Sequence, residues 1–554
     1  MKLKGLSNRA FNIFFHTHTV AGIVISFALY IIFFAGAFTI FRSEFYQWEN
    51  LEARIRLTKN AVEYDQIIQK LKQQYPDVNT EKDIIMRPGT AKEPLTTVWV
   101  SMKDKVGKNK NPKNEVKKAR AESLELVYHP INKTLKVSEG KFQKEGTTTI
   151  GETLFRLHYF SQIPLIGSYL SGLVAFFFLF ASITGVLIHW RNIITKFYGF
   201  SIRGTWKQIW TNAHTVFGLI GLPFQMMYAV TGAFYCLSIL LLAPATLVFF
   251  NGDQKAALAA FRPDRVIEVN EKSPISTNLK TINSTVNEFY KTIPDIEVTR
   301  VTVKHLGRED AILTAYLQDE TIFNGNGVVG VTLKDGKRVM EVLPKEKTYT
   351  QAVLGAIGTM HFAEFGGISL KIMFFLLALI TCFIIISGVL IWKEARNKKE
   401  YSEQQKRFHH RVTIWYLAIC FGLFPATAIL FMAERFIPMT LTNHSFWVNT
   451  SFFSAWLLLM ILGLFAKNES ILTKRYLYIN GFLSLIVPIS NGISTGDWLW
   501  KTLVNQQYYV AAVDIFWLLT ALISIVLAST ILNKSDETKK IKTVSTIKTN
   551  EQLA

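Results

Sequence analysis

Long uncharged apolar runs dominate the pattern of this chain. Eight of them are about 20 residues long, the length that an α-helix needs to cross the hydrocarbon core of a bilayer. The sequence therefore predicts eight membrane helices, at 18–41, 165–190, 214–243, 370–392, 412–433, 446–466, 476–493 and 508–532. The third run continues to Phe250, and Pro244 predicts the end of its helix because proline has no amide proton to donate.

The first four of these helices form two duplicated pairs. The first and third each contain a histidine followed by glycines four and eighteen residues later: His18, Gly22 and Gly36, then His214, Gly218 and Gly232. The second and fourth each contain a Gly-Val-Leu-Ile motif, and each motif begins 27 residues after a histidine, His158 or His361. Any function must explain this repeated association of histidines with helix ends.

A long polar segment separates the two members of each helix pair. Both segments, 42–164 and 251–369, contain a helical pattern that leads into Pro-Asp and is followed by alternating strand patterns. They predict two copies of a small α+β module. The chain then divides into 1–41 (first helix), 42–164 (first module), 165–250 (second and third helices), 251–369 (second module), 370–395 (fourth helix), 396–411 (basic loop), 412–533 (four further helices) and 534–554 (tail).

The distribution of positive charge predicts the orientation in the membrane. A net charge of +20 could suggest nucleic acid as a partner, but Lys and Arg gather at the ends of apolar runs, which argues against it. The five connections on one side of the membrane carry 22 Lys and Arg, whereas the two short loops on the other side carry two. The positive-inside rule therefore predicts that both termini are cytoplasmic and that both α+β modules lie on the outer side of the membrane.

Histidines at the ends of the duplicated helices are the candidate chemistry. A b-type haem needs two neutral imidazoles from facing helices, one on each side of its iron. By depth, His158 and His361 predict an outer haem, and His214 with either His18 or His189 predicts an inner haem. Each histidine alone is more often an interfacial residue, and the glycines equally suit close helix packing. The repetition at matched offsets favours haem.

Other motifs add little chemistry. The three cysteines lie inside apolar runs, with no spacing typical of a disulfide framework or a metal site. The GxGxxG match at 325–330 lies between strand patterns and opens no helix, so it predicts a hairpin and not a dinucleotide site. His129, His305 and His444 lie outside the predicted spans and predict surface positions, and His409 and His410 lie in a basic loop.

Four motifs carry a family resemblance. HTVAG at 18–22, SITGVLIHW at 182–190, WTNAHTVFG at 210–218 and MHFAEFGG at 360–367 resemble the PepSY-associated transmembrane family, and the two outer modules are similar to PepSY domains. The resemblance covers about residues 10–395 and leaves helices five to eight unexplained. The family includes bacterial iron-regulated inner-membrane proteins, among them dihaem ferric-siderophore reductases. The resemblance thus implies a bacterial inner membrane, with both modules in the periplasm. The resemblance thus implies that His18, His158, His189, His214 and His361 are the haem-ligand set.

These observations predict an α-helical polytopic membrane protein with about eight membrane helices, a duplicated haem-binding bundle and two periplasmic α+β PepSY-like modules. The expected function is oxidoreductase activity: electrons from a flavoprotein or quinol pass through two haem b groups to a ferric siderophore or another ferric chelate in the periplasm. Two alternatives stay open. The chain is a non-catalytic PepSY regulator of peptidases, or a transporter, for which Asp514 inside the last helix is thin support.

Overall fold

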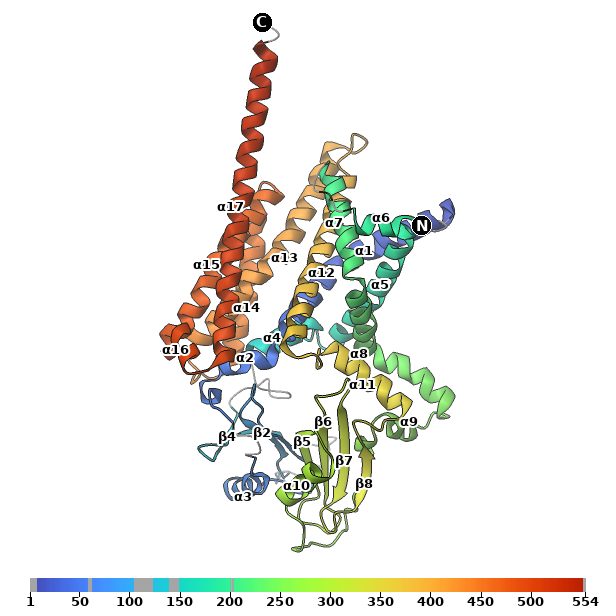
Figure 1. Cartoon of the computed structure of the whole chain (residues 1–554), viewed down its shortest axis with the longest axis vertical. Coiled ribbons are helices and arrows are strands. Elements are labelled where there is room, and N and C mark those ends of the chain that lie inside the picture. The colour runs from blue at the N-terminus through green and yellow to red at the C-terminus, as the bar shows by residue number, and fades with distance from the viewer. Residues whose placement is uncertain are drawn as a thin grey trace, which may run out of the picture. The chain divides into compact units, whose positions relative to one another are not determined.

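The computed structural model describes residues 7–57, 62–103, 123–138, 149–199, 201 and 204–551. The chain forms two compact units (Figure 1). The helical unit comprises Met1–Leu51, Gly146–Leu237 and Lys371–Ala554, and the sheet unit comprises Glu52–Glu145 and Ser238–Leu370.

Eight helices in the described residues are long and apolar enough to cross a membrane, as the sequence predicted. They lie within α1 (Asn8–Thr39), α5 with α6 (Ile166–His189, Ile193–Phe197), α8 (Leu222–Phe249), α12 (Gly367–Ala395), α13 (Glu403–Phe436), α14 (His444–Gly463), α15 (Glu469–Thr495) and α17 (Tyr508–Glu551). The shorter helices near these are α2 (Arg42–Glu49), α4 (Thr149–His158), α7 (Trp206–Ile220) and α16 (Leu499–Val504).

The third apolar run differs from its prediction in two ways. It forms two helices, α7 and α8, which are separated at Gly221. Pro223 lies in the first turn of α8. A proline there is tolerated because the first-turn amides of a helix have no partner inside that helix. Pro244 was predicted to end the helix, but α8 continues through it to Phe249. Proline is tolerated inside membrane helices when neighbouring groups satisfy the carbonyl that it leaves open.

Capping side chains fix where several helices begin. In α7 the Thr205 side chain accepts a hydrogen bond from the Gln208 amide, and the Gln208 side chain accepts one from the Thr205 amide. In α13 Ser402 and Gln405 make the same reciprocal pair. Such capping boxes satisfy two amides that the helix itself leaves without partners.

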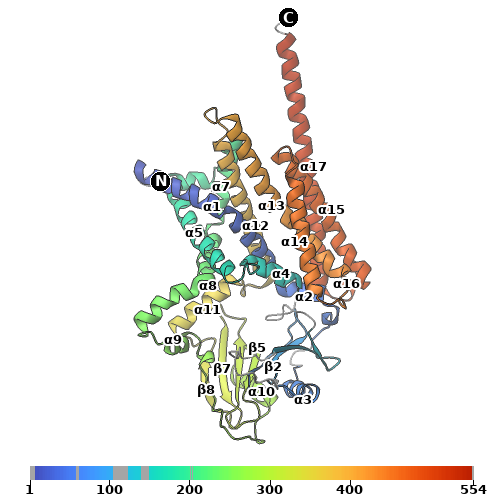
Figure 2. The same ribbon diagram turned by 180° about the vertical axis from the view of Figure 1, so that it is seen from behind.

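The last four long helices form a block of their own. α13 packs against α14 and α15, and α15 packs against α17 (Figures 1 and 2). In the other half of the helical unit, α1 packs against α5 and α4. Phe34 and Phe38 of α1 contact Phe424 of α13, so the first helix is also in contact with the C-terminal block.

A buried ion pair ties α2 to α12. Lys371 Nζ lies 2.9 Å and 3.2 Å from the two carboxylate oxygens of Glu44, and both side chains are largely buried. Removing one partner of such a pair leaves a buried charge without compensation, which costs more than the pair itself contributes.

We therefore expect Lys371→Met to lower the free energy of unfolding of the helical unit by about 3–5 kcal/mol. Thermal unfolding of the detergent-solubilised chain, followed by tryptophan fluorescence, measures this. Adding Glu44→Gln should restore most of the loss because the carboxylate that has lost its lysine is then replaced by a neutral amide. A single variant as stable as the unmodified chain would contradict the prediction.

The sheet unit contains the two predicted α+β modules, and their strands form one sheet. The first module has α3 (Tyr64–Gln74), β1 (Ile84–Arg87), β2 (Thr96–Ser101), β3 (Ser123–His129) and β4 (Thr134–Val137). The second has α10 (Ile282–Thr292), β5 (Glu297–Lys304), β6 (Ile312–Gln318), β7 (Asn326–Thr332) and β8 (Arg338–Val342), with α9 (Gln254–Phe261) before and α11 (Tyr349–His361) after. The strand order is β4-β3-β2-β1-β5-β6-β7-β8, and every pair is antiparallel.

The two modules meet through equivalent elements. β1 pairs with β5, with Ile85 opposite Thr302. Asp65 of α3 accepts hydrogen bonds from the amides of Ile282 and Asn283 at the start of α10, and the Asn283 side chain accepts one from the Asp65 amide. Apolar residues of α3, α10 and all the strands but β8 make one buried core. Reciprocal capping and a shared core thus join the duplicated modules.

The residues of the GxGxxG match lie in the β6–β7 hairpin, as predicted. Asn326 begins β7, and Gly327 and Gly330 are inside the strand. A Cβ at Gly325 would lie 1.8 Å from the Asp319 carbonyl oxygen, so the close turn explains this glycine.

One carboxyl of the sheet is buried without a basic partner in its hydrogen bonds. Glu125 on β3 is 4% exposed and accepts a hydrogen bond from Trp99 Nε1 on β2. Burial raises the pKa of Glu125 to about 7, against the opposing effect of hydrogen bonds from Trp99 and Ser138. The folded state thus holds this proton more tightly than the unfolded state, whose ordinary value is 4.5. Its contribution to stability is complete below the unfolded pKa and is lost as the pH rises through the folded pKa.

We expect Glu125→Gln to make β3 more resistant to local unfolding at about pH 8, by about 3 kcal/mol, and to leave it unchanged near pH 4. Hydrogen exchange of peptides covering β3 in the full chain, corrected for the intrinsic pH dependence of exchange, measures this. Glu297→Gln, at an exposed position of β5, is the control and should change neither value. Equal protection of β3 in the variant and the unmodified chain at both pH values would refute the effect.

Candidate functional site

The structure places four of the five predicted histidines in the helical unit. His18 lies on α1, His214 on α7, and His158 and His189 are the last residues of α4 and α5. His361 is the last residue of α11 and belongs to the sheet unit. All five side chains are half-buried. The pairing of His158 with His361 stays a prediction because the two residues belong to different units.

His18 and His214, which are repeat mates, come together. Their ring centres lie 6.1 Å apart, and the ring planes are nearly perpendicular at 79°. His18 Nδ1 lies 2.8 Å from the Ala181 carbonyl oxygen on α5. His214 Nδ1 lies 3.0 Å from the Ile384 carbonyl oxygen on α12. A protonated Nδ1 donates to a carbonyl, which leaves Nε2 as the nitrogen with the lone pair.

A glycine and a hydroxyl group lie close to the histidine ring at each of these contacts. A Cβ at Gly185 would lie 3.1 Å from His18 Cε1, and one at Gly388 would lie 3.3 Å from His214 Cε1. Each glycine follows the carbonyl residue by four positions, so carbonyl and glycine lie on the same helix face. The residue before each glycine is a hydroxyl residue within 3.5 Å of the histidine Nδ1: Thr184 for His18 and Ser387 for His214.

His158 repeats the arrangement on α1. Its Nδ1 lies 2.8 Å from the Ile32 carbonyl oxygen, and a Cβ at Gly36 would lie 2.8 Å from its Nδ1 and Cε1 atoms. Burial lowers the pKa of His158, against the hydrogen bond with Ile32, and so favours the neutral ring. Ile32 is fourteen residues beyond His18 on the same helix, about 21 Å along its axis. The two histidine positions are therefore separated by most of the ~30 Å hydrocarbon thickness.

His189 lies beside the first pair with a different partner. Thr215 Oγ1 is 3.4 Å from His189 Nε2. In His18, His158 and His214 the ring nitrogen that contacts a carbonyl is Nδ1. Among the hydrogen bonds of the described residues, none involves Nε2 of His18 or of His214. His18 and His214 thus share one arrangement, and His189 adopts another.

The His18–His214 geometry fits a group held between two imidazoles. A bond between a metal and an imidazole nitrogen is about 2 Å and each ring centre lies roughly 1 Å further, so two imidazoles on opposite sides of one iron have centres about 6 Å apart. A Cβ at Gly22 or Gly218 would meet no atom within 4 Å, which leaves room one turn from each histidine. The described residues contain no group of three or more His, Cys, Asp or Glu side chains that could hold a metal ion by itself. A haem needs only two axial ligands from the protein.

The sequence reading missed Thr184 and Ser387. The signal was present, because both precede the glycine of the repeated Gly-Val-Leu-Ile motif and are 203 residues apart, as the glycines are. The surface prediction for three lone histidines was wrong: His129, His305 and His444 are buried. Their hydrogen-bonding rings allow burial, as in His305, whose Nδ1 lies 2.9 Å from Asp310 Oδ1.

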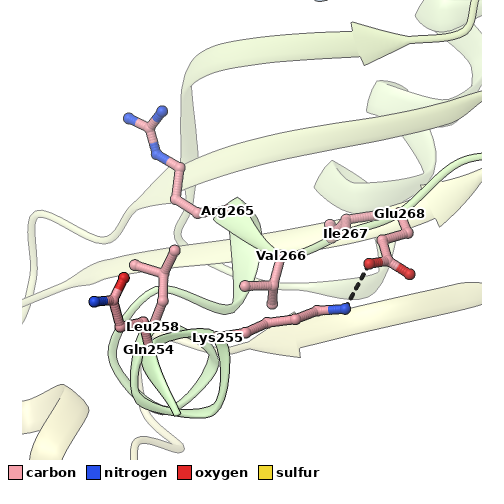
Figure 3. Close-up of a pocket in the computed structure, with 7 residues that line it drawn as sticks. All are labelled: Gln254, Lys255, Leu258, Arg265, Val266, Ile267 and Glu268. Carbon is pink, nitrogen blue, oxygen red and sulfur yellow. Dashed lines mark hydrogen bonds and ion pairs between the residues drawn. The ribbon is translucent and has the colours of Figure 1, made fainter. Parts of the chain in front are cut away.

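The sheet unit has a surface hollow of about 320 Å³ beside α9 (Figure 3). Leu258, Val266 and Ile267 give it an apolar lining, and Gln254 and Arg265 lie at its edge. Lys255 is ion-paired with Glu268 across it. Its lining holds no histidine or cysteine, so none of its side chains is a typical haem ligand. The sequence also predicts a basic loop at 102–121, rich in glycine, proline and asparagine, and residues 104–121 of that loop lie outside the described residues.

Comparison with curated proteins finds no match. The model of one family, described as the PepSY-associated TM region, matches residues 15–395. The matched region contains all five histidines and ends before α13, so the C-terminal four-helix block lies outside it. The match covers more than half of the chain. The protein therefore belongs to the family of the PepSY-associated TM region.

Proposed function

We propose that this protein is a transmembrane electron carrier with two b-type haems that reduces a ferric chelate, in the manner of a ferric-siderophore reductase. The observation that carries the proposal is the repeated contact of a histidine Nδ1 with a helix carbonyl, with a glycine one turn later. It occurs at His18, His214 and His158. Metal-binding histidines characteristically donate their other ring nitrogen to a carbonyl, which fixes both tautomer and ring orientation.

His214 and His18 are the proposed ligands of one haem. Their ring separation suits one iron between them, and the neighbouring glycines leave space. His189 was the open alternative, and its Nε2 is close to Thr215. We assign His189 a neighbouring role, as a polar group beside the haem. His158 and His361 are the proposed ligands of the second haem, on the strength of their matched places in the repeat.

Bound haem would supply a one-electron ferric–ferrous couple. The protein's own contribution is to hold the imidazoles neutral and oriented, and to exclude water with the surrounding apolar helices. With two histidine ligands from the protein, each iron would have no open coordination position. The chelate would then accept an electron without binding the iron and would need a docking surface on the protein. Fe(III) binds hard oxygen donors more tightly than Fe(II) does, so reduction releases the metal. The charge distribution favours a cytoplasmic or membrane donor, a flavoprotein or a quinol, and a periplasmic acceptor.

The test is an optical spectrum of the detergent-purified protein, oxidised and reduced with dithionite, with haem quantified per chain. We expect the sharp reduced α-band of bis-histidine haem b and about two haems per chain, followed by reoxidation on adding a ferric chelate. A colourless protein from haem-replete cells would exclude the proposal. It would leave the peptidase regulator and the transporter, neither of which requires haem.

A further inference from the structure

Two buried carboxyls lie at the N-terminus of the helix that carries His158. Glu49, the last residue of α2, accepts a hydrogen bond of 2.7 Å from the Ile150 amide in the first turn of α4. Glu434, near the end of α13, lies beside the Thr149 side chain at the start of α4. Glu49 is 6% exposed and Glu434 is 4% exposed. Both carboxyls thus lie at the N-terminal end of α4. Their sequence neighbours Trp48 and Arg435 are in contact, and the charge of Glu434 acts on Glu49.

The charges around this pair do not neutralise two carboxylates. Arg435 follows Glu434, and its guanidinium lies over the Trp48 ring, 4.2 Å from the ring centre. The neighbouring ionisable groups on the packed elements are Glu44 with Lys371, Glu152 with Arg42 and Arg156, Asp514 with Trp48 and Asn491, and His444. Glu44 and Glu152 thus have basic partners of their own, so Arg435 is the base that both Glu49 and Glu434 share in this part of the structure. Burial and the nearby Glu434 carboxyl raise the pKa of Glu49.

Glu434 also has an oxygen without a hydrogen bond. Its Oε2 atom is fully enclosed, and the described residues offer it no donor. A charged oxygen without a donor in such a place costs much more than a neutral one. Two carboxyls that share one site cannot both ionise easily, and the pair then holds a proton.

We propose that Glu49 and Glu434 form a proton-binding site that holds one shared proton at neutral pH and is linked in energy to the redox site at His158. The second half rests on the proposed function. α4 connects the two places, because its first two residues contact the carboxyls and its last residue is His158, about 13 Å away along the helix. α13 lies outside the region matched by the family, so this is a role for the C-terminal block.

The link follows from charge. An electron added at the His158 site makes it more negative and strengthens proton binding by the carboxyls, and a proton there favours the electron equally, because linkage is reciprocal. The step would balance with one electron from the flavoprotein or quinol donor of the proposed function. One carboxylate oxygen would take up one proton from the solvent and form one O–H bond. The reduction potential at His158 should therefore fall as the pH rises through the titration range of the pair.

Infrared difference spectra of the full chain in H₂O and D₂O test the proton-binding site without any need for haem. Protonated carboxyls give a carbonyl band that ionised ones lack. Glu434→Gln and Glu49→Gln should each remove the same band at neutral pH, because the remaining glutamate then has Arg435 to itself and ionises. Glu152→Gln, at a buried carboxyl of α4 paired with two arginines, is the matched control and should leave the band. A band that survives in both single variants would overturn the proposal.

Redox titration against pH then tests the link. In the unmodified chain one of the two haem potentials should fall with rising pH, and Glu434→Gln should abolish that slope while both haems remain bound. A slope that persists in the variant would refute the link and leave the proton-binding site standing. If the purified protein contained no haem, the proposed function would be refuted. The infrared spectra would still test the proton-binding site.

Discussion

Replacing His18 with alanine is expected to remove about one of two haems per chain and to lower ferric-chelate reduction by at least two orders of magnitude. The loss follows because a site built for two histidine ligands holds haem less tightly with one of them removed, and because an electron path with one carrier missing must cross ~20 Å of hydrocarbon unaided. Haem quantification and the reduced optical spectrum of the purified variant measure the first effect. Stopped-flow reoxidation by a ferric chelate measures the second.

Two variants of nearby histidines make this result specific. His16 lies two residues from His18 on α1 and is exposed, so His16→Ala should retain both haems and full activity. His189→Ala should also retain both haems, because His189 contacts Thr215 and does not share the arrangement of His18 and His214. If His189→Ala lost a haem and His18→Ala kept both, the proposed ligand assignment would be reversed. If neither lost haem, His18 would be a packing residue and not a haem ligand.

The membrane helices were predictable because the bilayer imposes a length on apolar runs, and all eight are present. The ends of these helices were less predictable. α1 begins at Asn8, ten residues before the predicted start, and its first turns contain Arg9 and His16. Hydropathy detects residence in hydrocarbon, whereas the helix begins where the Ser7 side chain caps it by accepting the Ala10 amide. A polar extension of a helix leaves no apolar signal.

The sheet contains a feature that sequence patterns could not predict. Helix and strand patterns predicted two modules, and both are present, but their union into one sheet rests on the pairing of β1 with β5. The paired residues Ile84 and Val303 are more than 200 positions apart. Alternation shows which face of a strand is buried and does not show which edge pairs with which. Tertiary contact decides that.

Only part of the histidine contacts could be predicted from the sequence. The duplicated histidines and glycines could be read directly, but their partners are main-chain carbonyls, of Ala181 and Ile384, and any residue type supplies a carbonyl. Only the accompanying hydroxyls, Thr184 and Ser387, leave a trace in the sequence. The repeat nevertheless relates these contacts to the sequence. Carbonyl, hydroxyl and glycine recur together at one offset of 203 residues, so the duplication copied a whole histidine support rather than a single side chain.

The same support makes the glycines sensitive positions, and Gly36 is the most crowded of the three. A Cβ there would lie 2.8 Å from two atoms of the His158 ring, so Gly36→Ala should displace the ring from the Ile32 carbonyl. We expect the variant to lose about one haem per chain, with the His18–His214 haem retained, and to lose ferric-chelate reduction. Overpacking also lowers stability, by about 1–3 kcal/mol, so stability must be separated from haem loss.

Gly481→Ala provides that separation. Its Cβ would lie 2.7 Å from Ile525 Cγ1, an equally close contact between membrane helices with no histidine nearby. An isoleucine side chain can move by rotation, so this control should lower the melting temperature modestly and keep both haems. Haem per chain and thermal unfolding, measured on the two variants together, give the comparison. If Gly36→Ala kept two haems at the same stability loss as Gly481→Ala, the glycine would serve helix packing alone. The contact with His158 would then have no part in holding a haem.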